Sequence, residues 1–328
     1  MMFLDQIGNT IRVATSSSYD TVAVTLQINS VTVASAVAGR VSSGYYYFAG
    51  VEELARAYME KNNHSIINFA AYYTASKNGS SVSITAVTGM VVYRSVSMRA
   101  HPLFNADALV ENRFLTPHKT AVVYAGASFF LYYYNTTADV SYSIVRTKRS
   151  DGTTVTSTGT ASTSGISSLA VSYDSQYSKA VVTMGNRTFT VFYFDIPAGE
   201  EFEFRNAFNI EEKVSIPAAT TESPKTEFEE AEQGRVRMRY DVENEVEFDV
   251  KTGNLPASMY AALLDMCRSR LVNRKYAYTA SGTTYTTNLE ILIKDYKLEK
   301  SNDVNKPISL EMKFVYANRN NIDAVIIE

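Results

Sequence analysis

An unbroken run of large side chains, FFLYYYN at residues 129–135, limits what this chain can fold into more than any other stretch. A β-strand points alternate residues to opposite faces of its sheet, so a strand here carries bulky rings on both faces. One face can pack into a core, but the other also has to be covered. The stretches GYYYF (44–48) and TVFYFD (190–195) have the same two-faced character.

Three arrangements would cover the second face of such strands. The strands can be central and buried on both sides within one chain. They can pack on another subunit, because Tyr and Phe are enriched in interface cores. They can also form a platform for sugar rings, although such sites often include Trp and this chain has 23 Tyr but no Trp. For the second arrangement, the expected interface residues are Tyr45, Tyr46, Tyr47, Phe130, Tyr132 and Tyr134.

Short strand-like segments separated by turn residues predict a mainly β protein. The chain has 328 residues, a length typical of two or three domains. We expect two antiparallel β-sandwich-like units followed by an α+β unit of the order ββ-α-ββ. The predicted domains are a β-rich domain at 1–100, a β-sandwich domain at 101–200 and the α+β domain at 201–328, with residues 100–115 as a linker or crossover.

Local signals fix several elements in the first two predicted domains. Asn78-Gly79 and Asp151-Gly152 are strong β-hairpin signals. Apolar residues at helical spacing predict a helix over 51–62, with Glu52 and Glu53 in its first turn and Lys61 near its end, which suits the helix dipole. The run at 153–168 is poor in apolar residues and reads as an exposed hairpin tip or loop.

The last predicted domain begins with a change in composition. Prolines and an acidic cluster at 216–234 indicate a linker or long loop. The alternating charges of 235–253 fit a hairpin that turns at 241–243, or a single longer strand with a kink. A helix follows at 256–271, with Pro256 in its first turn. Two strands, within NLEILIKDYKLEK and ISLEMKFVYANR, close the chain.

Residues that commonly carry catalysis are few. The three histidines are not clustered, so we expect no zinc site, and we interpret His118 as a surface or turn residue rather than a ligand. Cys267 lies on the apolar stripe of the 256–271 helix and fits a small buried hydrophobe better than a nucleophile. No phosphate-binding or hydrolase motif occurs. We therefore expect no cofactor and no enzymatic activity, with a hydrolase built from dispersed carboxylates as the least favoured reading.

Charge and hydropathy exclude further classes. The formal net charge is −3, whereas a nucleic-acid-binding chain normally shows a basic excess. No stretch reaches the roughly 20 apolar residues that span a bilayer. The N-terminus MMFLDQIGNT lacks the basic and apolar regions of a signal peptide, so we expect synthesis in the cytoplasm. A single cysteine rules out an internal disulfide framework.

The segment EFEFRNAFNIEE at 201–212 resembles a segment of uncharacterised structural proteins, of tail or baseplate type, from prophages of Bacteroides-type bacteria. The ββ-α-ββ unit is also similar in outline to tail-tube folds. The resemblance implies a virion part without catalytic residues, which homo-oligomerises and contacts other virion or tail proteins. A host-surface glycan is a further partner to consider, in line with a carbohydrate-binding or adhesin-like alternative. In the resembling proteins the motif joins two modules, so we expect Phe202, Phe204 and Phe208 to be buried at a domain junction, with Arg205 bound to carbonyls or a carboxylate.

Overall fold

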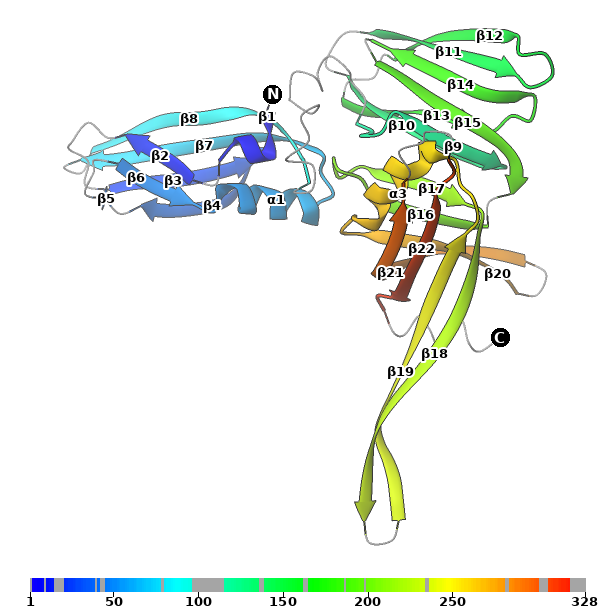
Figure 1. Cartoon of the computed structure of the whole chain (residues 1–328). Helices are drawn as coiled ribbons and strands as arrows, with labels where there is room; N and C mark the ends of the chain where they lie inside the picture. Colours follow the sequence, from blue (N-terminus) through cyan, green and yellow to red (C-terminus); the bar gives the residue numbers. More distant parts are fainter. Residues whose placement is uncertain are drawn as a thin grey trace. The chain divides into compact units, whose positions relative to one another are not determined.

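The computed structural model describes residues 2–8, 10–14, 21–38, 40–41, 45–77, 80–95, 115–135, 139–161, 165–185, 187–197, 199–233, 236–280, 283–300 and 306–318 (Figure 1). This part of the chain is mainly β, as predicted, with strands arranged in five sheets. The chain divides into two compact units. Unit 1 comprises Met1–Pro117 and Ala207–Ile210, and unit 2 comprises His118–Asn206 and Glu211–Glu328. The predicted boundary at 200/201 falls inside unit 2.

Unit 1 is built on a five-stranded sheet in the order β1-β8-β7-β3-β4, with a three-stranded sheet in the order β2-β6-β5. Strand β1 runs parallel to β8, and the other pairs are antiparallel. Its elements are β1 (Met2–Phe3), η1 (Leu4–Gln6), β2 (Thr10–Ala14), β3 (Thr21–Ile28), β4 (Val31–Ala38), β5 (Arg40–Val41), β6 (Tyr45–Ala49), α1 (Val51–Lys61), β7 (Ile66–Lys77) and β8 (Ser80–Val92).

Two local predictions for unit 1 are confirmed. Helix α1 occupies the predicted span and buries Val51, Ala55 and Met59 in one apolar cluster with residues of β3, β7 and β8. Strands β7 and β8 pair antiparallel, with Lys77 opposite Ser80, as the predicted hairpin requires, while Asn78 and Gly79 themselves lie outside the described residues. The predicted linker at 100–115 lies outside the described residues except for Leu115.

Unit 2 contains a five-stranded sheet in the order β12-β11-β14-β15-β9 and a two-stranded sheet of β10 and β13. Phe129 of β10 stacks on Phe189 of β15 with ring centroids 5.3 Å apart, so the two sheets share a core. Strand β9 pairs parallel to β15. The strands are β9 (Thr120–Ala125), β10 (Ser128–Asn135), β11 (Val140–Lys148), β12 (Thr154–Ala161), β13 (Gly165–Ser172), β14 (Tyr177–Met184) and β15 (Arg187–Pro197).

The rest of unit 2 is a seven-stranded sheet in the order β17-β16-β20-β21-β22-β19-β18. Its large apolar cluster contains residues of α3 and also Val122 and Tyr124 of β9. The other face of β9 is buried as well, through Ala121 and Val123. The elements are β16 (Glu200–Arg205), β17 (Glu211–Ile216), β18 (Ala218–Gln233), β19 (Val236–Thr252), η3 (Ala257–Met259), α3 (Tyr260–Cys267), β20 (Val272–Ala280), β21 (Thr283–Glu299) and β22 (Ser309–Tyr316).

Strands β18 and β19 form a long antiparallel ribbon, which Figure 1 shows extending beyond the rest of the seven-stranded sheet. The predicted linker at 216–234 is therefore wrong, because most of it is strand β18. The predicted hairpin at 241–243 is also wrong, and the alternative of one longer strand is confirmed. Acidic residues near the base of β19 are neutralised by lysines of its two neighbours: Glu247 lies 2.7 Å from Lys225 and 3.1 Å from Lys313.

Two further predictions need correction. The predicted helix at 256–271 begins with η3 and ends at Cys267, because Ser269 hydrogen-bonds through its side chain to the backbone of Arg205 and Leu271 instead of continuing the helix. The predicted hairpin tip or loop at 153–168 holds all of β12 and the start of β13. Strand β12 is exposed along most of its length, because it is the edge of its sheet, and this explains its polar composition.

Candidate functional site

The strand that corresponds to FFLYYYN has one closed and one partly open face. In β10, burial alternates along the strand: Phe129, Leu131 and Tyr133 are buried, whereas the residues between them are half-buried. The half-buried row is Phe130, Tyr132 and Tyr134, which are the three residues of this strand that we predicted at an interface. The prediction of a two-faced strand is thus borne out by its burial pattern, while its role in an interface stays a prediction.

Strand β13 extends this partly open face. The register places Ala170 opposite Phe130, Ser168 opposite Tyr132 and Ile166 opposite Tyr134. Directly opposite residues share a face in an antiparallel pair, and all three β13 residues are exposed, with 40% of Ile166 accessible. We call this surface the β10–β13 outer face; its residues are Phe130, Tyr132, Tyr134, Ile166, Ser168 and Ala170. The β13 residues were not predicted, because the polar run at 153–168 resembles a hairpin tip or loop, although Ile166 interrupts it.

The tyrosine hydroxyls of the β10–β13 outer face are poor acids. Burial raises the pKa of Tyr132 above its usual range, and the carboxylates of Glu211 and Glu212 raise it further. Burial also raises the pKa of Tyr134. Both hydroxyls therefore stay protonated at neutral pH and can donate or accept hydrogen bonds. This face is suited to apolar contact and hydrogen bonding rather than to acid–base chemistry.

The other aromatic strand of unit 2 packs against apolar residues of the chain on both faces. In β15, Phe189, Val191 and Tyr193 are buried on one face. On the opposite face, Phe192 and Phe194 pack against the large apolar cluster of the seven-stranded sheet, and the ring centroid of Phe194 lies 6.0 Å from that of Tyr124. For TVFYFD, the chain itself provides the second cover.

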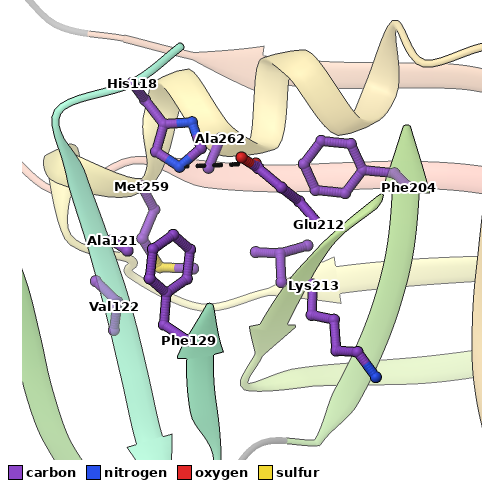
Figure 2. Close-up of a pocket in the computed structure, with 10 residues that line it drawn as sticks. His118, Ala121, Val122, Phe129, Phe204, Glu212, Lys213, Met259 and Ala262 are labelled. Carbon is purple, nitrogen blue, oxygen red and sulfur yellow. Dashed lines mark ion pairs between the residues drawn. The ribbon is translucent and has the colours of Figure 1, made fainter. Parts of the chain in front are cut away.

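His118 lies in a small pocket of unit 2, beside strands β9, β10, β16 and β17 (Figure 2). Its side chain is 2% exposed, so His118 is not a surface residue, although it does lie in the bend that precedes β9. The imidazole packs between aromatic rings, with centroids 5.7 Å from Phe189 and 6.3 Å from Phe129. Apolar packing from β10 and β15 covers the ring, which the adjoining Pro117 in the sequence could not reveal.

The polar neighbour of His118 is Glu212 on β17. Figure 2 shows the imidazole and the carboxylate pointing toward each other, with His118 Nε2 3.9 Å from Glu212 Oε2. Asn206 Nδ2 donates to the other carboxylate oxygen at 2.9 Å, and Arg187 donates to the backbone carbonyl of His118 at 3.2 Å. Among the described residues, neither ring nitrogen of His118 has a hydrogen-bond partner.

Burial makes this histidine a very weak base. It lowers the pKa of His118 to about 3, with a smaller contribution from the positive charge of Arg187. The imidazole is therefore neutral at physiological pH and forms no ion pair with Glu212. The pocket has a volume of about 10 Å³ for the centre of a water molecule, which is room for about one water. This space is too small for an organic molecule.

Other candidates for chemistry are equally closed. Cys267 is buried, and burial raises the pKa of its thiol to about 12, so it is a protonated apolar residue, consistent with the sequence interpretation. Within the described ranges, no group of three or more His, Cys, Asp or Glu side chains is arranged to hold a metal ion. None of the helices in that part of the chain is both long and apolar enough to cross a membrane.

The segment EFEFRNAFNIEE contributes to both units. Phe202 and Phe204 are buried in the apolar cluster of unit 2, and Arg205 lies 3.2 Å from the carboxylate of Glu211. Phe208 is buried and belongs to unit 1. The junction role of these residues stays a prediction.

Within unit 1, Asn209 adopts a left-handed conformation with φ of 60°. Its side-chain Nδ2 donates to the carbonyls of Met59 at 3.3 Å and His64 at 3.1 Å. These two hydrogen bonds attach the segment to the end of α1 and the residues that follow it. The predicted interface residues Tyr45, Tyr46 and Tyr47 lie in β6, but their side chains are outside the described part of the structure.

Comparison with known proteins adds little. No protein-family model matches the chain, and no curated protein matches it. Among solved structures, the extracellular region of plexin A4 is similar over 92% of this chain, with 8% sequence identity and a TM-score of 0.18. The chain spans 36% of the length of that structure. A similarity this weak carries no argument about fold or function.

Proposed function

We propose that this chain is a non-enzymatic structural protein that self-associates through the β10–β13 outer face, as a subunit of the tail or baseplate of a phage or prophage particle. The observation that supports it is the contrast between the two aromatic strands of unit 2. On the second face of β15, Phe192 and Phe194 are half-buried and pack against an apolar cluster of the chain. Phe130, Tyr132 and Tyr134 are half-buried as well, but they belong to neither apolar cluster of the described residues and lie beside an exposed Ile166. A second copy of the chain is the proposed cover.

The chemistry of the β10–β13 outer face suits such an interface. Apolar surface removed from water contributes roughly 25 cal/mol per Å², and Tyr is enriched among residues that dominate binding energy. The protonated hydroxyls of Tyr132 and Tyr134 can hydrogen-bond at the wet rim of an interface. Small neighbours on β13, Ser168 and Ala170, leave the aromatic row accessible to an opposing surface.

The test compares two isoleucine- or valine-to-lysine variants of the full chain. Ile166→Lys places a charge on the β10–β13 outer face, and Val155→Lys places one on β12, where the exposed fraction is almost the same, 39% against 40%. In sedimentation velocity, we expect the wild type to form oligomers and Ile166→Lys to weaken association by roughly tenfold or more, while Val155→Lys has no effect. A monomeric wild type at high concentration, or equal effects of both variants, would contradict self-association through this face.

The particle assignment needs a separate test. We expect the neighbouring genes to encode tail-tube, tape-measure or baseplate proteins, and unrelated neighbours would count against a virion part. A glycan array covers the carbohydrate-binding alternative. Binding that disappears in Tyr132→Ser, together with a monomeric wild type, would favour a glycan-binding role over assembly.

A further inference from the structure

The imidazole of His118 is a buried polar group whose hydrogen bonds the described side chains do not provide. Both ring nitrogens are inaccessible to solvent, and among the described residues neither has a hydrogen-bond partner. A buried donor or acceptor without a partner lowers the stability of the fold, and most buried polar groups in proteins are bonded to protein atoms or to ordered water. A further partner is therefore expected at this imidazole.

The pocket between His118 and Glu212 has the dimensions of a water site. His118 Nε2 lies 3.9 Å from Glu212 Oε2, which is too far for a direct hydrogen bond. Both side chains line the pocket and point toward each other in Figure 2. The pocket has a volume of about 10 Å³ for the centre of a water molecule, which is room for about one water. A water placed beside the line between the two atoms lies within about 2.7–3.2 Å of both.

The donors and acceptors around this space determine how such a water is oriented. The Glu212 carboxylate only accepts hydrogen bonds, and Asn206 Nδ2 donates to its Oε1 at 2.9 Å. The imidazole is neutral at physiological pH, because burial lowers the pKa of His118 to about 3, so one ring nitrogen carries a hydrogen and the other a lone pair. With the hydrogen on Nε2, a water accepts from the ring and donates to Oε2. With the hydrogen on Nδ1, the ring's donor has no acceptor among the described residues.

We propose that this pocket binds one water molecule, which accepts a hydrogen bond from His118 Nε2–H and donates one to Glu212 Oε2. The remaining walls are mainly apolar, with Val122 and Met259 among them, so the two polar side chains hold the water in place. The water would connect the bend before β9 to strand β17. The inference concerns the core of unit 2 and does not depend on the proposed self-association.

The first test uses the wild-type full chain in solution. In isotope-labelled protein, NMR spectra of the imidazole nitrogens distinguish the nitrogen that carries hydrogen from the one that does not, and the signals of His118 are those missing in His118→Leu. We expect the hydrogen on Nε2 and magnetisation transfer from water to it. The hydrogen on Nδ1 would overturn the proposal, and so would an Nε2–H that receives no magnetisation from water, which would indicate a direct hydrogen bond to Glu212.

A crystal structure of the full chain at a resolution that shows ordered waters provides a second, independent test. We expect density for one water within about 3.2 Å of both His118 Nε2 and Glu212 Oε2. A pocket without that density, or one in which the two side chains contact each other directly, would overturn the proposal.

Glu212→Gln tests the orientation of the water. Because Asn206 donates to Oε1, the amide oxygen of the variant should take that place and its NH₂ group should face the pocket. The water would then accept from the amide and donate to His118 Nε2, so we expect the tautomer ratio to shift toward Nδ1–H by roughly tenfold or more. An unchanged ratio in the folded variant would overturn the proposed orientation.

The matched control makes the same chemical change one residue earlier on β17. Glu211 is exposed on the opposite side of the strand, so Glu211→Gln should leave both the tautomer of His118 and its contact with water unchanged. Equal shifts in Glu211→Gln and Glu212→Gln would show that the tautomer responds to overall charge and not to the bridge. If Glu212→Gln does not fold, the two measurements on the wild type still decide the proposal.

Discussion

Strands β10 and β15 have nearly the same aromatic content and opposite surroundings. Both bury one face in the same sandwich core, where Phe129 stacks on Phe189. The second face of β15 meets the apolar cluster of the seven-stranded sheet, whereas the second face of β10 belongs to a sheet of only two strands and stays half-buried. A strand with large apolar residues on both faces therefore needs packing partners on both faces. The position of the strand in the fold decides whether the same chain provides the second partner.

Removal of a ring from the core shared by β10 and β15 should have the strongest effect on stability. Phe189→Ala removes a fully buried ring that contacts both Phe129 and His118, so we expect the free energy of unfolding to fall by about 3–5 kcal/mol. Urea denaturation of the wild type and the variant measures this loss. The exposed neighbour on the same strand provides the control, because Thr188→Ala should change stability by less than about 0.5 kcal/mol. A loss below about 1 kcal/mol for Phe189→Ala would mean that the shared core is not packed as described.

A pH-dependent effect tests whether the shared core excludes water around His118. Folding lowers the pKa of this histidine from its ordinary value of 6.5 to about 3, so the unfolded chain binds a proton in this window and the folded chain does not. The free energy of unfolding is therefore highest above pH 6.5 with respect to this histidine. It falls as the pH drops toward 3, by up to about 1.4 kcal/mol per pH unit.

The test measures the free energy of unfolding of the wild type and His118→Leu from pH 7 to pH 5. The difference in their pH dependence gives the contribution of the buried histidine. We expect the variant to lose less stability than the wild type, by about 2 kcal/mol at pH 5. Equal slopes in the wild type and His118→Leu would show that the imidazole can be protonated in the folded protein.

Alanine substitutions on the outer faces of β10 and β15 test the difference between these faces and should have the weakest effects. Phe194→Ala opens the covered face of β15 and should lower the free energy of unfolding by about 1–3 kcal/mol, less than for a fully buried ring. Tyr134→Ala on β10 should cost less than about 1 kcal/mol in a monomer but should weaken association of the full chain. Thermal unfolding at low concentration and sedimentation velocity at high concentration measure the two quantities. A loss of association in Phe194→Ala and a loss of stability in Tyr134→Ala would contradict the roles that we assign to the two strands.

Local signals in the sequence predicted local structure well. The spacing of Val51, Ala55 and Met59 located helix α1, and Asp151-Gly152 located the hairpin of β11 and β12, where Gly152 has the positive φ of 72° that glycine permits. The alternation of Phe129 to Tyr134 appeared as alternating burial. These features depend on residues near one another in the chain, so their physical causes are visible in a short window.

The failures involve partners that are distant in sequence. Pro224 favoured a linker, but it lies in an edge strand, where a missing N–H is tolerated. The alternating charges at 235–253 suggested a hairpin within that segment. In the structure, the arginines of β19 lie opposite β18 instead, which the sequence indicated as a linker or loop. The burial of His118 depends on Phe129 and Phe189, and no pattern around residue 118 indicates which side chains will surround it. Such pairings need the fold before they can be recognised.

The burial of β9 on both faces has a consequence for folding during translation. Val122 and Tyr124 belong to an apolar cluster that is completed by Phe314 and Tyr316 of β22. A ribosome that adds about 5–20 residues per second needs roughly 10–40 s to synthesise the chain between these points. During that interval the nascent polypeptide displays the apolar side of β9 without its final cover, so a chaperone that shields this strand during translation would benefit unit 2.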